Sequence, residues 1–263
     1  LKRKRPIVPK LAANLSWLFT EVDFLERFNG AAQAGFKGVE FLFPYEFKAS
    51  DIANRLQDND LDVVLINAPP GDWSAGERGL GCLPGRQADF RGSLSQAIDY
   101  ATAIGCPNIH IMAGIAAAEA TDLFIENLHF AAAACASAGL RGLIEPINDI
   151  DMPGYFLTRP DQAMDILDTV ASPALGLQLD LYHVARMGFD PGQVIDMCLG
   201  AIAHIQIAGV PERQEPDGGD VDFAVLFDKI DDHGYDGWIG CEYRPKTTCA
   251  CGLGWASQYL SRP

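Results

Sequence analysis

The chain alternates short β-rich runs with longer helix-like segments along its whole length, and this alternation constrains the fold more than any other feature. The strand-like runs are KLAANLS (10–16), GVEFLF (38–43), DVVLINA (62–68), NIHIMAG (108–114), RGLIEPIN (141–148), LGLQLDLYH (175–183), HIQIAG (204–209) and GWIGCEY (237–243). The helix-like segments that follow them span residues 23–34, 50–59, 87–104, 121–138, 159–171, 191–201, 223–234 and 252–260. Eight such units in 263 residues predict a single (β/α)8 barrel, the TIM barrel.

Several strand-like runs are almost wholly apolar, which is typical of parallel strands covered by helices. A doubly wound open sheet is the alternative fold, but it normally carries a glycine-rich phosphate loop after an early strand. The chain contains neither GxGxxG nor GxxxxGK[ST]. No linker divides it, so we expect residues 10–263 to form one barrel domain. Residues 1–9 are predicted to be a frayed basic extension rather than a nuclear signal or a nucleic-acid arm.

The net charge of −15 argues against a nucleic-acid partner, which would need a basic face. The basic start, LKRKR, is not followed by an apolar segment, and no run of about 18 apolar residues occurs, so neither a signal peptide nor a membrane span is expected. Seven scattered cysteines without a CxxC indicate a reduced, cytoplasmic protein. A small-molecule partner is expected, and a homo-oligomer is left open.

Polar side chains follow four consecutive strands at the carboxyl ends, where barrels of this kind carry their functional residues. They are Glu145, Asp180, Gln206 and Glu242. Three carboxylates and an amide that meet at one point would repel one another unless a divalent cation lies between them. All four offer oxygen, which favours Mg²⁺ or Mn²⁺. A single carboxylate of this kind can instead cap a helix or pair with a lysine, so the metal site depends on the four occurring together.

Three histidines lie close to predicted strands. His110 lies within the fourth strand-like run, and His183 ends the sixth. Such histidines often only complete a core, but beside a metal site they predict contacts with a substrate. His204 begins its strand-like run, at the bottom of the predicted barrel, and we interpret it as structural.

Longer segments between Lys10 and Trp255 carry a resemblance that covers nearly the whole chain. They are LAANLS, GFKGVEFLFPYEF, GDWSAGERGLGCLPGR, IEPIN, QLDLYH, HIQIAG, PERQEPDGGDVDF and GWIGCEYRPK. Together they resemble the hydroxypyruvate isomerase family, part of the xylose-isomerase-like barrel superfamily that also holds sugar-phosphate isomerases and ketose 3-epimerases. The resemblance implies a divalent metal on the four polar residues named above, with Glu145 and Glu242 as the acid–base pair.

The resemblance also implies that His183 contacts substrate oxygens and that Arg213 reaches over the substrate. An acidic protein that binds an anionic oxo-acid needs a local cation. Arg213 is our first choice for this cation, and Arg86, in the loop after the third strand-like run, is the second. We also include His110 and Asn67 among the predicted substrate-binding residues.

The implied reaction converts hydroxypyruvate to tartronate semialdehyde through an ene-diolate. A 2-oxo-tetronate isomerase and a ketose 3-epimerase, which use the same two glutamates, are alternatives. IEPIN is closer to the hydroxypyruvate branch, and HIQIAG is closer to the 2-oxo-tetronate branch. A zinc-dependent phosphodiesterase needs more histidine ligands than five scattered ones supply. A non-catalytic binding barrel is disfavoured because the four-oxygen site is intact.

The chain departs from the family near its C-terminus. There the family tends to read Thr-Thr-Thr-Glu-Ala-Gly-Leu, whereas residues 247–253 read TTCACGL, so Ala250 replaces a glutamate. This departure removes the basis for expecting a substrate or subunit contact from this segment, and it leaves the predicted metal site unaffected.

Overall fold

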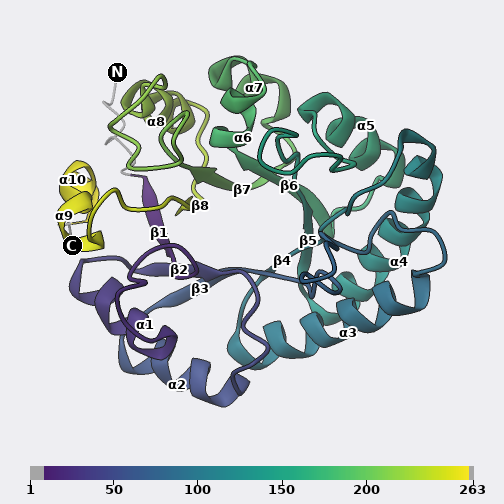
Figure 1. Ribbon diagram of the computed structural model, residues 1–263, viewed down its shortest axis with the longest axis horizontal. Helices are drawn as coiled ribbons and strands as arrows, with labels where there is room; N and C mark the ends of the chain where they lie inside the picture. Colours follow the sequence, from purple (N-terminus) through teal and green to yellow (C-terminus); the bar gives the residue numbers. More distant parts are fainter. Residues whose placement is uncertain (1–8, 261–263) are drawn as a thin grey trace.

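The computed structural model describes residues 9–260, and the eight strands within them close into one parallel barrel (Figure 1). Each strand pairs with the next along the chain, and the last pairs with the first. The strands are β1 (Lys10–Asn14), β2 (Gly38–Phe41), β3 (Asp62–Asn67), β4 (Asn108–His110), β5 (Arg141–Ile144), β6 (Leu175–Asp180), β7 (Ile202–Ile207) and β8 (Trp238–Cys241). The predicted (β/α)8 barrel is confirmed. The predicted frayed extension, residues 1–9, lies outside the described residues except for Pro9.

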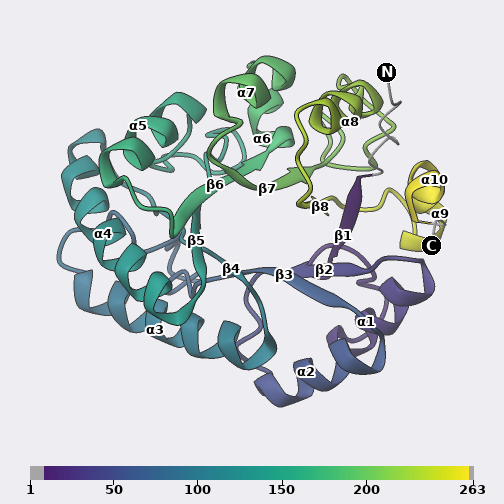
Figure 2. The same cartoon turned by 180° about the vertical axis from the view of Figure 1, so that it is seen from behind.

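The helices form a ring around the barrel (Figures 1 and 2). They are α1 (Phe24–Gln33), α2 (Ala49–Asp58), α3 (Gln87–Ile104), α4 (Thr121–Ala138), α5 (Pro160–Val170), α6 (Leu181–Arg186), α7 (Pro191–Cys198), α8 (Phe223–Asp232), α9 (Cys249–Gly252) and α10 (Ser257–Leu260). Two short 3₁₀ helices, η1 (Ala118–Ala120) and η2 (Leu253–Ala256), complete the set within the described residues. Their apolar faces and the outer faces of the strands share one large core.

Each of the eight strands differs from its predicted run at one or both ends, and two of these differences change the position of a histidine. The run LGLQLDLYH stops pairing at Asp180, because the Asp180 side chain accepts a hydrogen bond from the Tyr182 backbone N–H at 2.9 Å and caps α6. His183 therefore lies on a helix at the barrel mouth rather than on a strand. In β7, pairing begins at Ile202, so His204 is the third residue of its strand and not the first.

The barrel interior contains an apolar layer and, closer to the carboxyl ends of the strands, a polar layer. Ala12 and Leu143 are buried in a small apolar cluster. Because side chains alternate between the two faces of a strand, the residues two positions further on, Asn14 and Glu145, share that face. Both are buried and polar. The fold therefore carries a buried polar layer toward the carboxyl ends of its strands.

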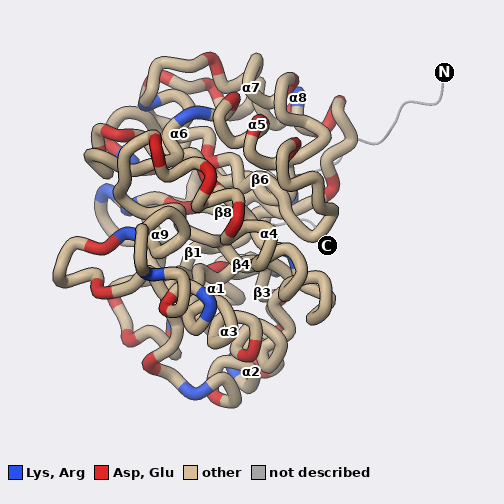
Figure 3. Tube along the Cα trace, turned by 90° about the vertical axis from the view of Figure 1, so that its right-hand side faces the viewer, with Lys and Arg blue, Asp and Glu red and all other residues tan. Residues whose placement is uncertain are grey.

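The chain is acidic, with 35 Asp and Glu against 20 Lys and Arg, and Figure 3 shows the acidic residues spread over the trace. Within residues 9–260, no helix has the length and apolar character needed to cross a membrane. All seven cysteines fall in this range and are free thiols, six of them buried.

Candidate active site

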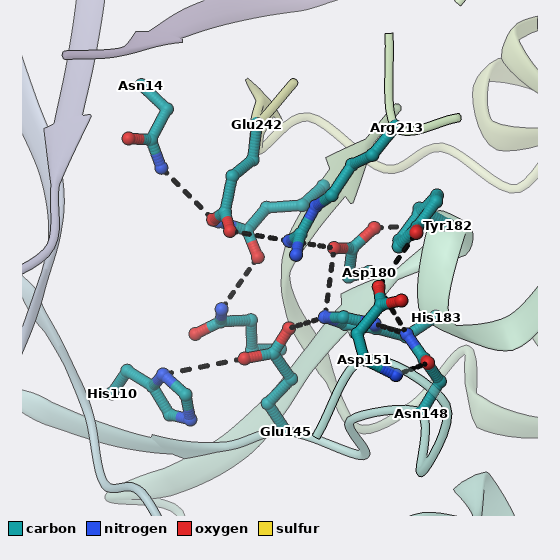
Figure 4. A network of polar contacts seen from close by, with 12 residues as sticks. Asn14, His110, Glu145, Asn148, Asp151, Asp180, Tyr182, His183, Arg213 and Glu242 are labelled. Atoms are coloured by element: carbon teal, nitrogen blue, oxygen red, sulfur yellow. Dashed lines mark hydrogen bonds and ion pairs between the residues drawn. The ribbon is translucent and has the colours of Figure 1, made fainter. Parts of the chain in front are cut away.

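A cavity of about 540 Å³ opens at the carboxyl ends of the strands. Six of the predicted site residues line it: Asn67, His110, Glu145, His183, Arg213 and Glu242. Asp180 and Gln206 are not among its lining residues, but both contact residues that are. Figure 4 shows Glu145 and Glu242 reaching the same space from opposite sides, with Arg213, Asp180 and His183 beside them.

Arg213 brings a positive charge between two of the carboxylates. Its Nη2 donates to Oε1 of Glu242 at 2.7 Å and lies 3.4 Å from Oδ2 of Asp180. The guanidinium also packs on the rings of Trp17 and Tyr182, at 4.7 and 4.8 Å from their centroids. Its position is set by the loop after β7, where Arg213 has a φ of 53°.

The other oxygen of Glu242 is held by two amides. Its Oε2 accepts from Nδ2 of Asn14 at 3.0 Å and from Nε2 of Gln206 at 2.6 Å. The Gln206 amide is turned this way because its Oε1 accepts from Nε2 of Gln178 at 2.6 Å. In this orientation Gln206 donates to carboxylates, whereas the sequence predicts that its oxygen binds a metal.

The two histidines flank Glu145. His110 Nδ1 lies 3.5 Å from Glu145 Oε2, and His183 Nε2 lies 3.7 Å from Glu145 Oε1 and 3.5 Å from Asp180 Oδ2. On the far side of its ring, His183 Nδ1 accepts from Nδ2 of Asn148 at 2.5 Å. This contact leaves the proton on Nε2, which faces the carboxylates and the cavity.

Burial shifts the pKa of each carboxyl upward. It raises the pKa of Glu145 well above its usual value, helped by the negative charges of Glu242 and Asp180. It raises the pKa of Glu242 to about 8 and that of Asp180 to about 6, although Arg213 opposes both shifts. Burial also opposes the charge on Arg213 itself, but Glu242 and Asp180 outweigh it and raise the pKa of Arg213.

The histidines are neutral for the same reason. Burial lowers the pKa of His110 to about 3, and burial together with the Arg213 charge lowers that of His183 well below its usual value. Neither ring nitrogen of the buried His110 has a hydrogen-bond partner among the described residues. A buried polar group without a partner is costly, so His110 is suited to bind a polar ligand atom in the cavity.

Arg86 and Asn67 occupy different positions relative to the cavity. Arg86 is outside the described residues that line it, and its guanidinium forms ion pairs with Glu77 and Asp89. Asn67 lines the cavity at the end of β3, and its backbone carbonyl accepts from the Tyr45 hydroxyl at 2.5 Å.

The segment that departs from the family is a short capped helix. Thr248 caps α9 by accepting from the Cys251 backbone N–H at 3.3 Å, and Cys249 is buried. Ala250 is exposed and is not among the described residues that line the cavity.

Several residues in or beside the cavity are not among those predicted from the sequence: Asn14, Trp17, Glu40, Arg78, Asn148, Gln178, Tyr182 and Arg244. Glu40 carried a usable signal, because it is an acidic residue inside the apolar run GVEFLF. The same signal drew attention to Glu145 and Glu242.

The donor set fits a divalent cation. Single ligand atoms of Glu145, Asp180 and His183 lie within 4.8 Å of one another, and all three residues are buried. Three buried carboxyls with raised pKa values face one guanidinium, so further positive charge would relieve their repulsion. Oxygen-rich sites of this kind suit Mg²⁺ or Mn²⁺.

Residues 28–259 match the model of the xylose isomerase-like TIM barrel family. A 2-oxo-tetronate isomerase from Cupriavidus necator is 50% identical over 260 residues, which cover 97% of this chain and 100% of that protein. The hydroxypyruvate isomerase of Escherichia coli is 42% identical over 255 residues, which cover 95% of this chain and 99% of that protein.

Two solved structures extend the comparison. A Brucella melitensis protein named AP endonuclease, family 2, has a TM-score of 0.94 at 46% identity, covering 95% of this chain and 99% of its own. The 3-keto-D-glucoside 4-epimerase of E. coli has a TM-score of 0.80 at 16% identity, covering 96% of this chain and 98% of its own, which is a likeness of fold.

Proposed function

Since the chain belongs to the xylose isomerase-like TIM barrel family, we propose that it isomerises a small oxo-acid with a carbonyl at C2 and a hydroxyl at C3. Relatives at 42–50% identity over nearly the whole chain are named as isomerases, which confirms the predicted enzyme class. The observation that carries the proposal is the pair Glu145 and Glu242. These buried carboxyls have raised pKa values and reach one cavity from opposite sides (Figure 4).

The reaction requires one proton to move between carbons and one between oxygens. A carboxylate removes the proton from C3, and the electrons of that C–H bond form the C2–C3 double bond of an ene-diolate while the C2 carbonyl gains negative charge. The same carboxyl or its partner returns a proton to C2. The O3 proton passes to O2, so the carbonyl ends at C3. Glu145 and Glu242 are the two groups proposed for the carbon-bound protons.

Other residues of the cavity bind and orient the substrate in this proposal. His183 donates its Nε2–H to a substrate oxygen, and the ring of His110, whose nitrogens make no hydrogen bond to the described residues, provides a second polar contact. Glu145, Asp180 and Glu242 would hold Mg²⁺ or Mn²⁺, which when bound would supply positive charge to the two substrate oxygens.

Two substrates fit this chemistry. Hydroxypyruvate, the substrate predicted from the sequence, and 2-oxo-tetronate both carry the C2 carbonyl and the C3 hydroxyl. One 2-oxo-tetronate isomerase matches at 50% identity, above the 42–44% of relatives named hydroxypyruvate isomerase, although two others match at 41% and 39%; the 50% match is our reason for expecting the four-carbon acid. The cavity of about 540 Å³ is large enough for either.

A panel of three- and four-carbon oxo-acids and of ketoses, assayed with added Mg²⁺ or Mn²⁺, tests the proposal. We expect turnover of the oxo-acids, with 2-oxo-tetronate giving the higher kcat/KM. In D₂O, deuterium is expected at C2 of the product. Inversion of C3 in a ketose, without turnover of oxo-acids, would instead identify a 3-epimerase.

Arg213 is the proposed contact for the substrate carboxylate, because it lines the cavity and its buried Nε has no hydrogen-bond partner among the described residues. We expect Arg213→Ala to raise KM for the oxo-acid about 10-fold or more, as for loss of a charge-assisted hydrogen bond. Arg86→Ala should leave KM unchanged, because the Arg86 guanidinium is paired with Glu77 and Asp89. An unchanged KM in Arg213→Ala would contradict the assignment.

A DNA-directed activity, which the name of the Brucella protein raises, is not favoured. The net charge of −15 opposes a nucleic-acid partner. Among the described residues that line the cavity, only His110 and His183 are histidines, which is too few for the zinc cluster of such an enzyme.

A further inference from the structure

A buried carboxylate lies beneath the cavity without any role in the reaction described above. Glu40, on β2, is 1% exposed and is not among the described residues that line the cavity. Its Oε2 lies 2.6 Å from Nε2 of His204, which is also 1% exposed. Burying a charge in a barrel interior costs several kcal/mol unless the charge is paired and hydrogen-bonded. The contacts that stabilise Glu40 therefore need an explanation.

The other oxygen of Glu40 joins it to Glu242 through two amide groups. Glu40 Oε1 accepts from Asn14 Nδ2 at 2.9 Å and from Gln206 Nε2 at 2.7 Å. The same two nitrogens donate to Oε2 of Glu242, at 3.0 and 2.6 Å. An amide NH₂ has two hydrogens, so each amide can donate one hydrogen to Glu40 and the other to Glu242.

Gly240, on β8, leaves space for the Glu40 carboxylate, and further hydrogen bonds hold the two amides in one orientation. A Cβ at Gly240 would lie 2.4 Å from both carboxylate oxygens of Glu40. The far ends of the amides are also occupied, because Asn14 Oδ1 accepts from the Ser16 backbone N–H and Gln206 Oε1 accepts from Gln178.

We propose that Glu40 is a positioning residue for the isomerisation, which holds the NH₂ groups of Asn14 and Gln206 against Oε2 of Glu242. Glu242 is then fixed with its Oε1 toward Arg213 and the cavity (Figure 4). His204 orients Glu40 in turn by donating to Oε2, which gives this histidine a place in the same chain of contacts. The inference rests on the proposed function, since it assigns how one of the two proposed bases is aimed.

Glu40→Gln tests the proposal. Glutamine has one acceptor atom, so it cannot accept from Asn14, Gln206 and His204 together as the carboxylate does. We expect kcat to fall about 10–100-fold, as when an outer hydrogen-bond partner of a site is removed, with KM within about twofold. Glu40→Asp keeps the charge but shortens the side chain, and it should recover part of kcat. If Glu40→Gln does not fold, Glu40→Asp replaces it in the experiment below.

A double-mutant cycle shows whether Glu40 acts through Glu242. In a Glu242→Gln background, Glu40→Gln should lower the residual rate less than about twofold, because the base that it aims is gone. The same loss in both backgrounds, or an unchanged kcat in the single variant, would overturn the proposal. Asn127→Leu is the control for a buried polar change, since Asn127 donates to Gly81 and neither residue is among the described ones that line the cavity, and it should leave kcat unchanged.

The assays also separate this inference from the proposed function. Wild-type turnover of oxo-acids with a normal Glu40→Gln rate removes only the role of Glu40. Wild-type protein that turns over no oxo-acid removes the proposed function and the role of Glu40 together.

Discussion

Replacing Glu145 or Glu242 with glutamine is expected to lower kcat at least about 10²-fold, the lower range for a positioned acid–base group. Glutamine keeps the shape of the side chain and an oxygen atom but cannot take up the substrate proton. The two residues follow β5 and β8 and reach the cavity from opposite sides, so each faces a different side of a bound substrate (Figure 4). The measurement is kcat beside the uptake of solvent deuterium.

Metal content must be measured in the same samples, because both glutamates are also predicted ligands. Metal should still bind, more weakly. Near-normal turnover in either variant would make that glutamate a ligand only, and the two-base mechanism would then be wrong. Glu212→Gln is the matched control, because Glu212 lines the exposed rim of the same cavity without a hydrogen bond or ion pair to the described residues, and it should keep its kcat.

The fold could be predicted from the sequence because periodicity and capping agree along most of the chain. Helix α3 has the predicted bounds, Gln87–Ile104, and Gly105 ends it with a φ of 74° that favours glycine. Strand ends were harder to place. The run LGLQLDLYH remains apolar after Asp180, but the capping contact of that side chain starts a helix, which a hydrophobic pattern does not reveal.

The candidate site was predictable where a polar residue follows an apolar run, and less so where contacts cross the barrel. Glu145, His183, Arg213 and Glu242 all line one cavity. Glu40 carried the same sequence signal but precedes the four consecutive strands on which the predicted metal site was built. Its partner Asn14 is its register neighbour on β1, whereas Gln206 and His204 are 166 and 164 residues away in sequence and meet it only because the barrel closes.

Arg86 shows that a position in a loop near the barrel mouth does not by itself bring a cation into the cavity. It follows the long glycine-rich loop after β3, and a cation near the barrel mouth was expected to reach the substrate. Its ion pairs with Glu77 and Asp89 hold the guanidinium outside the described lining of the cavity. Arg78 and Arg244, which do line it, stack on Trp73 and Trp17, and stacking partners of this kind cannot be read from spacing.

Removing divalent cations with EDTA is expected to abolish turnover, and added Mg²⁺ or Mn²⁺ is expected to restore it. Burial raises the pKa of Glu242 to about 8 and raises that of Glu145 well above its usual value, so it favours the protonated forms, which cannot accept a proton from C3. A divalent cation among them favours the charged forms and lowers both pKa values. Arg213 supplies only one positive charge against three buried carboxyls.

The test compares kcat with metal content after chelation and after titration with Mn²⁺, whose binding is also followed by electron paramagnetic resonance. Asp180→Asn removes a charge from the cluster that includes Glu145 and His183, so it should weaken Mn²⁺ binding. This loss is measured directly by electron paramagnetic resonance, without an activity assay. Full activity in protein that is verified to be metal-free would contradict the metal requirement. Arg213 would then be the cation left at the carboxylates to stabilise the ene-diolate, and Arg213→Ala should abolish kcat instead of raising KM.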